Sequence, residues 1–234
     1  GFGSVYAATD TRDGRQVALK VLRRGSADAL LRFKREFRSL ADVRHRNLVQ
    51  LHELLQVGDK WLLSMERVEG EPFDVFVGKH PERLRDVLGQ LVEGVAALHA
   101  AGKLHRDLKP SNVLVEDGGR VVILDFGLVR ERGTEGSTVL AGTPVFMSPE
   151  QCAEQELGPA SDWYAVGVIL YQALSGRVPF EGSMVELLRA KQERAAPPLE
   201  TGGELAELAM RLLARDPKER PRGEALVRML SASK

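Results

Sequence analysis

The chain has 234 residues, with 33 acidic and 33 basic side chains and a hydrophobic fraction of 43%. That fraction is large enough for a packed core and excludes a chain that is disordered throughout. A formal net charge of zero argues against a general nucleic-acid or membrane-surface binder, because such proteins carry an excess of lysine and arginine.

The cysteine content and the hydropathy pattern indicate the cellular location that we expect. The one cysteine, Cys152, excludes an internal disulfide framework, which fits a reducing compartment. The longest apolar run, from Trp163 to Tyr171, is well short of the ~20 residues that cross a bilayer. We therefore expect a cytoplasmic location, with no nucleic acid and no membrane contact within this segment.

The first third of the chain predicts a small β-rich unit with one helix. Apolar residues alternate over residues 15–22, which indicates a strand. Residues 27–41 carry leucine and phenylalanine at helical spacing, with charged residues between them, and predict an amphipathic helix. Residues 49–55 and 61–68 predict two further strands around a Gly58-Asp59 turn.

The rest of the chain is mainly helical. Leucine and valine recur at three- and four-residue steps from residue 84 and predict a long helix that ends near Gly102. Two short strands are expected at 113–115 and 121–124. The further helices are expected at residues 160–174, 184–192, 204–214 and 223–230. A β-rich lobe joined to a helical lobe near residues 66–72 forms a cleft, and ligands bind in such clefts.

One loop carries the chemistry. The stretch His105-Arg106-Asp107-Leu108-Lys109-Pro110-Ser111-Asn112 is followed by Asp125-Phe126-Gly127. Phosphoryl transfer from a nucleotide needs such a set, with a carboxylate for the attacking hydroxyl, metal-binding oxygens and a lysine that offsets phosphate charge.

With Val17-Ala18-Leu19-Lys20 upstream and Ser148-Pro149-Glu150 downstream, the sequence resembles the eukaryotic-type serine/threonine protein kinases that bacteria also encode. The resemblance covers nearly the whole chain. It implies an α+β, bilobal protein-kinase fold, with a small β-rich N-lobe (residues 1–68), the end of a hinge (69–71) and a larger, mainly helical C-lobe (72–234).

The family resemblance also places the start of the chain. Gly3 and Val5 match the end of the glycine-rich nucleotide loop, and Gly1 lies between its last two glycines. We therefore expect the chain to begin within that loop, to lack the first strand and to bind ATP more weakly for that reason.

The resemblance assigns the chemistry to four residues. Asp107 is the catalytic base or substrate-orienting carboxylate, and Lys109 neutralises the γ-phosphoryl group and marks serine/threonine specificity. Asn112 and Asp125 are the Mg²⁺ ligands, and their hard oxygens suit that metal.

ATP contacts follow by the same resemblance. Lys20 contacts the α- and β-phosphates and Glu36 pairs with it, although either residue alone reads as an ordinary surface charge. The remaining nucleotide-binding positions are the loop glycines Gly1 and Gly3, the adenine-covering Val5, Ala18 and Leu114, the gatekeeper Met65, and the hinge residues Glu66 and Val68.

Four further residues have structural roles in the family. Glu150 is expected to pair with Arg220, and Asp162 to anchor the catalytic loop. His105 is expected to be a packed scaffold residue rather than an acid or base.

The resemblance implies an ATP-dependent protein serine/threonine kinase in signalling, whose partners are proteins with serine or threonine acceptors. Autophosphorylation of the loop at Thr134, Ser137 or Thr138, of which Thr138 is preferred, would involve self-association; that these are ordinary loop hydroxyls stands equally open. The alternative function is a pseudokinase or nucleotide-binding scaffold, against which the full set of catalytic side chains counts.

Overall fold

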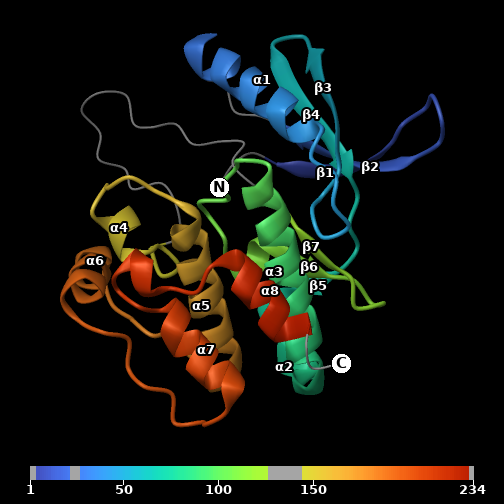
Figure 1. The fold of residues 1–234 in the computed structure, drawn as a ribbon. Helices are drawn as coiled ribbons and strands as arrows, with labels where there is room; N and C mark the ends of the chain where they lie inside the picture. The colour runs from blue at the N-terminus through green and yellow to red at the C-terminus, as the bar shows by residue number, and fades with distance from the viewer. Residues whose placement is uncertain (1–3, 22–26, 126–143, 232–234) are drawn as a thin grey trace.

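The computed structural model describes residues 4–21, 27–125 and 144–231, and within them it leaves out the side chains of residues 27–30, 32, 36 and 231. Two lobes are visible in Figure 1, a small sheet with one helix above and a helical body below. The predicted bilobal α+β architecture is confirmed.

The small lobe is an antiparallel sheet covered by a helix. Its elements are β1 (Val5–Thr9), β2 (Gln16–Val21), α1 (Ala27–Ala41), β3 (Leu51–Val57) and β4 (Lys60–Glu66). The strands lie in the order β1-β2-β4-β3. Val5 is opposite Lys20 and Ala18 is opposite Met65, so the register brings several expected nucleotide-binding residues to neighbouring strands.

The large lobe is built around a buried helix. Its helices are α2 (Phe73–Lys79), α3 (Leu84–Ala100), α4 (Pro149–Cys152), α5 (Pro159–Ser175), α6 (Met184–Glu193), α7 (Glu204–Leu212) and α8 (Gly223–Ser231), with short 3₁₀ turns at Pro81–Arg83, Pro110–Asn112 and Pro217–Glu219. Every residue from Ser161 to Tyr171 is buried, so α5 is enclosed on all sides. A helix that is apolar all round is expected at such a position.

A second, three-stranded sheet lies under the junction of the lobes. It consists of β5 (Glu71–Pro72), β6 (Val113–Val115) and β7 (Val121–Ile123), in the order β5-β6-β7. The short strands expected at 113–115 and 121–124 are confirmed, and β6 and β7 place the catalytic loop between α3 and this sheet.

The segment between α1 and β3 forms backbone hydrogen bonds with the large lobe. The N–H of Val49 donates to the Ile123 carbonyl at 3.0 Å, and the N–H of Ile123 donates to the Asn47 carbonyl at 2.9 Å. Asn47 is fully buried, and its side chain donates to the Val121 carbonyl at 2.7 Å. Gly94 on α3 permits this approach, because a Cβ there would lie 2.7 Å from Ile123 Cδ1 and 3.0 Å from the Asn47 carbonyl.

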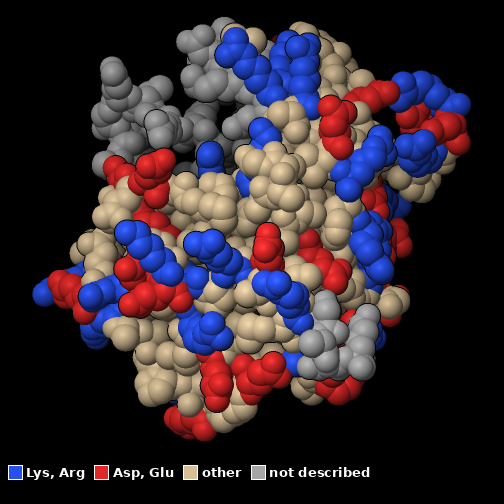
Figure 2. All heavy atoms as spheres, viewed as in Figure 1, with Lys and Arg blue, Asp and Glu red and all other residues tan. Residues whose placement is uncertain are grey.

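The surface agrees with the zero net charge. Figure 2 shows basic and acidic side chains interspersed over both lobes of the face in view. Among the described residues no helix is both long and apolar enough to span a bilayer.

Candidate active site

Three of the predicted site residues meet on one loop. Lys109 Nζ lies 3.3 Å from Asp107 Oδ2. Asn112 donates through Nδ2 to the Asp107 carbonyl at 2.9 Å, and the same nitrogen is 3.5 Å from Asp107 Oδ2. The 3₁₀ turn Pro110–Asn112 makes this return possible, since it reverses the chain between Lys109 and the strand β6. The carboxylate is therefore held beside one cation and one amide.

The loop backbone is held from α5. Asp162 Oδ2 accepts the N–H of His105 and Asp162 Oδ1 accepts the N–H of Arg106, each at 2.8 Å. Arg106 has a φ of 67°, a left-handed conformation that costs energy for a residue with a Cβ. The two bonds to one buried carboxylate stabilise this turn, which leads directly into Asp107. The predicted anchoring role of Asp162 is confirmed.

A histidine completes the surroundings of Asp162. His99 Nε2 lies 2.8 Å from Asp162 Oδ2, and its ring meets Trp163 edge-on at 5.0 Å. Burial would raise the pKa of Asp162, but the hydrogen bonds from His99 and from the backbone N–H of His105 outweigh it and lower that pKa. The anchor is therefore a carboxylate at neutral pH.

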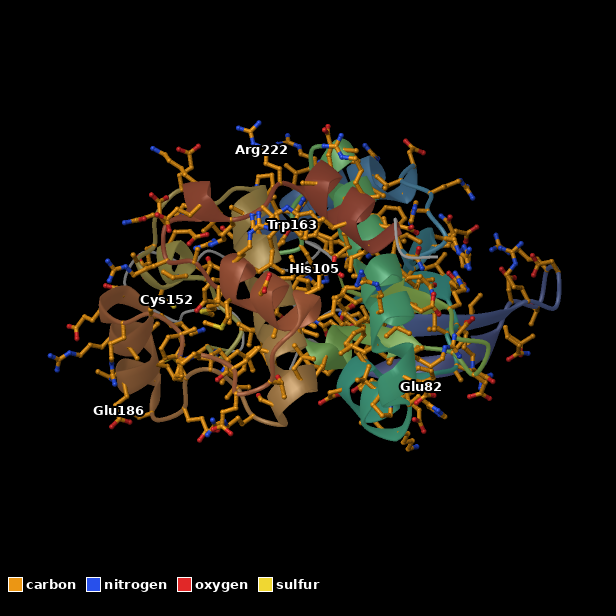
Figure 3. All side chains as sticks on the ribbon, turned by 60° about the horizontal axis from the view of Figure 1, so that its bottom comes forward. Glu82, His105, Cys152, Trp163, Glu186 and Arg222 are labelled. Carbon is orange, nitrogen blue, oxygen red and sulfur yellow. The ribbon has the colours of Figure 1, made fainter. Side chains whose placement is uncertain are left out.

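His105 is a scaffold residue. Its side chain is in the interior of the large lobe near Trp163 of α5, as Figure 3 shows. Nε2 lies 2.9 Å from the Leu124 carbonyl, and Nδ1 accepts the N–H of Asp107 at 3.3 Å. Burial lowers the pKa of His105, against the pull of Asp162, so the ring is neutral. A neutral ring with both nitrogens engaged by backbone does not serve as an acid or base; its expected neighbour Phe126 lies outside the described residues.

The two lobes meet at an ion pair. Lys20 on β2 is buried, and its Nζ lies 2.6 Å from Asp125 Oδ1. Asp125 has a φ of 55°, which turns it out of the line of β7. The side chain of the expected partner, Glu36 on α1, lies outside the described part of the chain, so the predicted Lys20–Glu36 pair stays a prediction.

The expected adenine-site residues lie on strands of both lobes. Met65 is buried on β4, beside the half-buried Ala18 on β2. Val5 is exposed at the start of β1, and Leu114 is half-buried on β6 in the other lobe. Glu66 ends β4, and its side chain accepts from Arg120 at 2.7 Å, an ion pair that reaches across to the β6–β7 turn. Val68 follows in the connecting segment, while Gly1 and Gly3 lie outside the described residues.

Asn112 and Asp125 suit a hard cation. Asn112 Nδ2 is engaged by the Asp107 carbonyl, which leaves Oδ1 as the atom that can coordinate a metal. The N–H of Leu124 donates to the Asn112 carbonyl at 2.8 Å, so the backbones that carry the two ligands are tied together. Mg²⁺ takes one or two protein oxygens and completes its shell with phosphate and water, and this pair supplies that donor set. Within the described residues no cluster of three His, Cys, Asp or Glu side chains offers a different metal site.

The segment before α4 is fastened to the catalytic loop. Ser148 caps α4 by accepting the N–H of Gln151, and Gln151 Oε1 accepts the N–H of Ser148 in return. Gln151 Nε2 also donates to the Arg106 carbonyl at 2.7 Å. Glu150 and Arg220 form the predicted ion pair, with contacts of 2.6 and 2.9 Å between buried side chains. Burial would raise the pKa of Glu150, but Arg220 outweighs it and lowers that pKa.

Sequence reasoning missed some of these residues. Gln151, three residues after Ser148, completes a capping-box pattern that the sequence displays. Arg120 and His99 carry no local signal, because their partners Glu66 and Asp162 lie 54 and 63 residues away. The loop hydroxyls Thr134, Ser137 and Thr138 lie outside the described residues.

Comparison with known proteins agrees with this geometry. A family model described as protein kinase domain matches residues 1–230. The chain is 38% identical over 244 residues to the serine/threonine-protein kinase pkn2 of Myxococcus xanthus, covering 94% of this chain and 29% of that protein. It is 38% identical over 192 residues to PknL of Mycobacterium tuberculosis, covering 78% of this chain and 48% of that protein. It is 32% identical over 209 residues to PrkC of Bacillus subtilis, covering 85% and 32%.

The chain thus spans about a third to a half of the length of these curated relatives. All three are named serine/threonine-protein kinases, and none of the comparisons supports the alternative of a pseudokinase. A matching model over nearly the whole chain and relatives that are 32–38% identical lead to one conclusion: the chain belongs to the protein kinase domain family, as a catalytic domain of the bacterial serine/threonine type.

Proposed function

We propose that the protein containing this domain transfers the γ-phosphate of ATP to serine and threonine hydroxyls of other proteins, and that Asp107, Lys109, Asn112, Lys20 and Asp125 carry the reaction. The observation that supports this most directly is the loop geometry, with Lys109 and Asn112 both against Asp107. In this proposal the lobes divide at residues 69–71.

The loop residues have separate tasks. Asp107 accepts the hydrogen bond of the attacking hydroxyl and takes its proton as the oxygen–phosphorus bond forms and the bond to the leaving diphosphate breaks. Lys109 offsets the negative charge of the transferred group. Positioning and charge stabilisation supply most of the rate in this reaction, so a loop fixed by Asp162 is the arrangement that it needs.

Nucleotide contacts come from both lobes. Lys20 reaches the α- and β-phosphates, supported by Glu36, and Val5, Ala18, Leu114 and the hinge around Met65, Glu66 and Val68 enclose the adenine. Asn112 and Asp125 would hold Mg²⁺, which neutralises phosphate charge when bound. Lys20 and Asp125 form an ion pair at 2.6 Å. In this proposal the phosphates bind beside its ammonium group and the metal binds beside its carboxylate.

The wider setting is part of the proposal. We place the domain in the cytoplasm, where ATP is available, and expect two copies to associate when loop hydroxyls such as Thr138 are autophosphorylated. Phosphopeptide mapping of active protein tests the latter, and a loop without phosphate contradicts it.

The central test is Mg²⁺-dependent transfer of labelled γ-phosphate from ATP to proteins and peptides with serine or threonine acceptors. Asp107→Asn keeps the shape of the side chain and removes its charge. We expect it to lower kcat by ~10²–10⁴-fold, the contribution of a general base.

Asp117→Asn is the matched control, because Asp117 is an exposed aspartate on the β6–β7 turn of the same lobe. It is expected to keep full activity. Transfer that survives Asp107→Asn, or that proceeds equally well with EDTA in place of Mg²⁺, contradicts the proposal.

A further inference from the structure

Lys191 on α6 is an almost fully buried lysine, with 1% of its surface exposed. Its ammonium donates to three backbone carbonyls, those of Pro144 at 2.8 Å, Val145 at 2.6 Å and Met147 at 2.6 Å. A lysine ammonium has three donors, so all of its hydrogen-bonding capacity is used on one short turn.

Burying the Lys191 ammonium costs free energy, and the hydrogen bonds to the turn are what it provides in return. Burying an ammonium is unfavourable, and among the described residues no carboxylate forms an ion pair with Lys191 to offset the cost. Burial lowers the pKa of Lys191 to about 8, so at neutral pH the group is still mainly an ammonium and can make all three bonds. The ring of Tyr164 on α5 lies 5.5 Å from Nζ and closes the site on another side.

The turn is held by apolar packing and by Lys191. Val145 and Phe146 are half-buried and pack against the core of the large lobe, and Met147 is buried. Within the turn, the N–H of Met147 donates to the Pro144 carbonyl at 3.3 Å, a long bond. The carbonyls of Pro144, Val145 and Met147 therefore rely on Lys191 for most of their hydrogen bonding.

The turn also lies beside the reaction centre. It leads directly into Ser148 and α4, and Gln151 of α4 donates to the carbonyl of Arg106, the residue before Asp107. Figure 3 shows α4, marked by Cys152, next to α6, marked by Glu186. The turn is thereby connected through α4 to the residue before Asp107, whereas the expected nucleotide-binding residues Val5, Ala18 and Lys20 lie on strands of the small lobe.

We propose that Lys191 is a positioning residue for the protein acceptor: by holding the Pro144, Val145 and Met147 carbonyls from α6, it fixes the surface that the acceptor segment contacts next to Asp107. The inference rests on the proposed kinase function and deepens it. It predicts that Lys191 affects transfer to protein acceptors and leaves ATP binding and ATP hydrolysis by water unchanged.

The test measures three rates on the same protein: transfer to a degenerate serine/threonine peptide library, steady-state transfer to one peptide chosen from it, and hydrolysis of ATP by water. Lys191→Met keeps the aliphatic stem and removes the three donors. Lys191→Arg restores positive donors in the same place. Lys218→Met, at an exposed lysine of the same lobe, is the matched control.

We expect Lys191→Met to lower kcat/KM for the peptide by about tenfold or more, mainly through KM, and to alter the library preference. ATP hydrolysis and the KM for ATP should stay within about twofold of wild type. Lys191→Arg should recover part of the lost kcat/KM.

Two results overturn the inference while the proposed function stands: an unchanged peptide kcat/KM in Lys191→Met, or a parallel fall in peptide transfer and ATP hydrolysis. If Lys191→Met does not fold, Lys191→Gln, which keeps a polar donor, is judged by the same two results. A wild-type protein that hydrolyses ATP but phosphorylates no library peptide overturns the proposed function, and the inference with it.

Discussion

Two ion pairs, one in each lobe, differ in how deeply they are buried. In the small lobe, Arg12 pairs with Asp10 at 2.7 Å, and the two side chains are 67% and 20% exposed. In the large lobe, Arg220 pairs with Glu150 at 2.6 Å, and the two side chains are 0% and 6% exposed. Both contacts are short, so distance alone does not distinguish them.

The difference lies in what each pair holds. Arg12 and Asp10 belong to one hairpin of the small sheet. Arg220 and Glu150 join chain segments 70 residues apart and hold the start of α4. Asp162 holds the catalytic loop, and Lys191 holds the turn of residues 144–147. The buried charges of the large lobe fix segments next to Asp107, whereas the Arg12–Asp10 pair lies on a small lobe whose buried Lys20 reaches across to Asp125.

The sharpest test of this contrast is Arg220→Met. Removing one partner leaves the Glu150 carboxylate buried without its cation, and the expected loss is about 3–5 kcal/mol in the free energy of unfolding. Urea denaturation measures it. Arg189→Met, which breaks an exposed i,i+4 pair with Glu193, is the control and should cost only ~0.3–0.5 kcal/mol. Equal effects of the two substitutions would remove the contrast.

Acid should weaken the large lobe through His105. Burial holds the pKa of this residue below its ordinary value, so below about pH 6.5 the unfolded chain binds a proton that the folded chain does not. The free energy of unfolding therefore falls as the pH is lowered from 7 toward 5.5. His105→Gln should flatten this slope without abolishing it, because burial also lowers the pKa of His45 and His52.

Urea titrations at several pH values provide the measurement. His80→Gln, at an exposed histidine, serves as the control for the His→Gln exchange itself. A slope that is identical in His105→Gln and wild type would show that the buried ring does not titrate on unfolding.

The variant Arg120→Ala tests the contact between the two lobes. Its guanidinium donates to Glu66 at 2.7 Å and to the Arg46 carbonyl at 2.9 Å, so it links the β6–β7 turn to two points of the small lobe. Arg120→Ala should cost about 1 kcal/mol, since the pair is partly exposed. Hydrogen exchange should accelerate at residues 44–50, and unchanged exchange there would mean that the link is dispensable.

The smallest effect is expected for Arg12→Ala. Arg12 is 67% exposed and its contacts with Asp10 and Glu53 are weakened by water, so the midpoint of urea denaturation should not shift beyond experimental error. Raising the salt concentration should leave that result unchanged. A loss as large as that of Arg220→Met would contradict the distinction between the two ion pairs.

Much of this organisation was predictable from sequence. The helix over 27–41 agrees with the structure because its apolar spacing is regular, and Gly102, with a φ of 70°, lies just beyond α3 as a helix stop should. The motif residues of the catalytic loop could be assigned because they are close together in the chain. Short elements such as α4, with four residues, have no period to detect.

The unpredicted features are long-range. Lys191 follows Leu187 and Ala190 at the spacing of the buried face of α6, which was a local signal that this lysine points inward. Its partners lie 44 to 47 residues earlier and are backbone carbonyls, which leave no mark on the side-chain sequence. The spacing of apolar residues therefore indicated that Lys191 is buried, but it did not indicate which carbonyls Lys191 binds.

The attachment of Asn47 and Val49 to β7 has a mechanical consequence. Although these residues lie between α1 and β3 in the chain, they travel with the large lobe, because their backbone is paired with Ile123. Any rocking of the small sheet over the nucleotide must then be accommodated at two crossings, near residues 43–46 and near residues 66–70. Two crossings define a hinge axis, whereas a single crossing would permit free rotation, so we expect any opening of the small lobe to follow one arc.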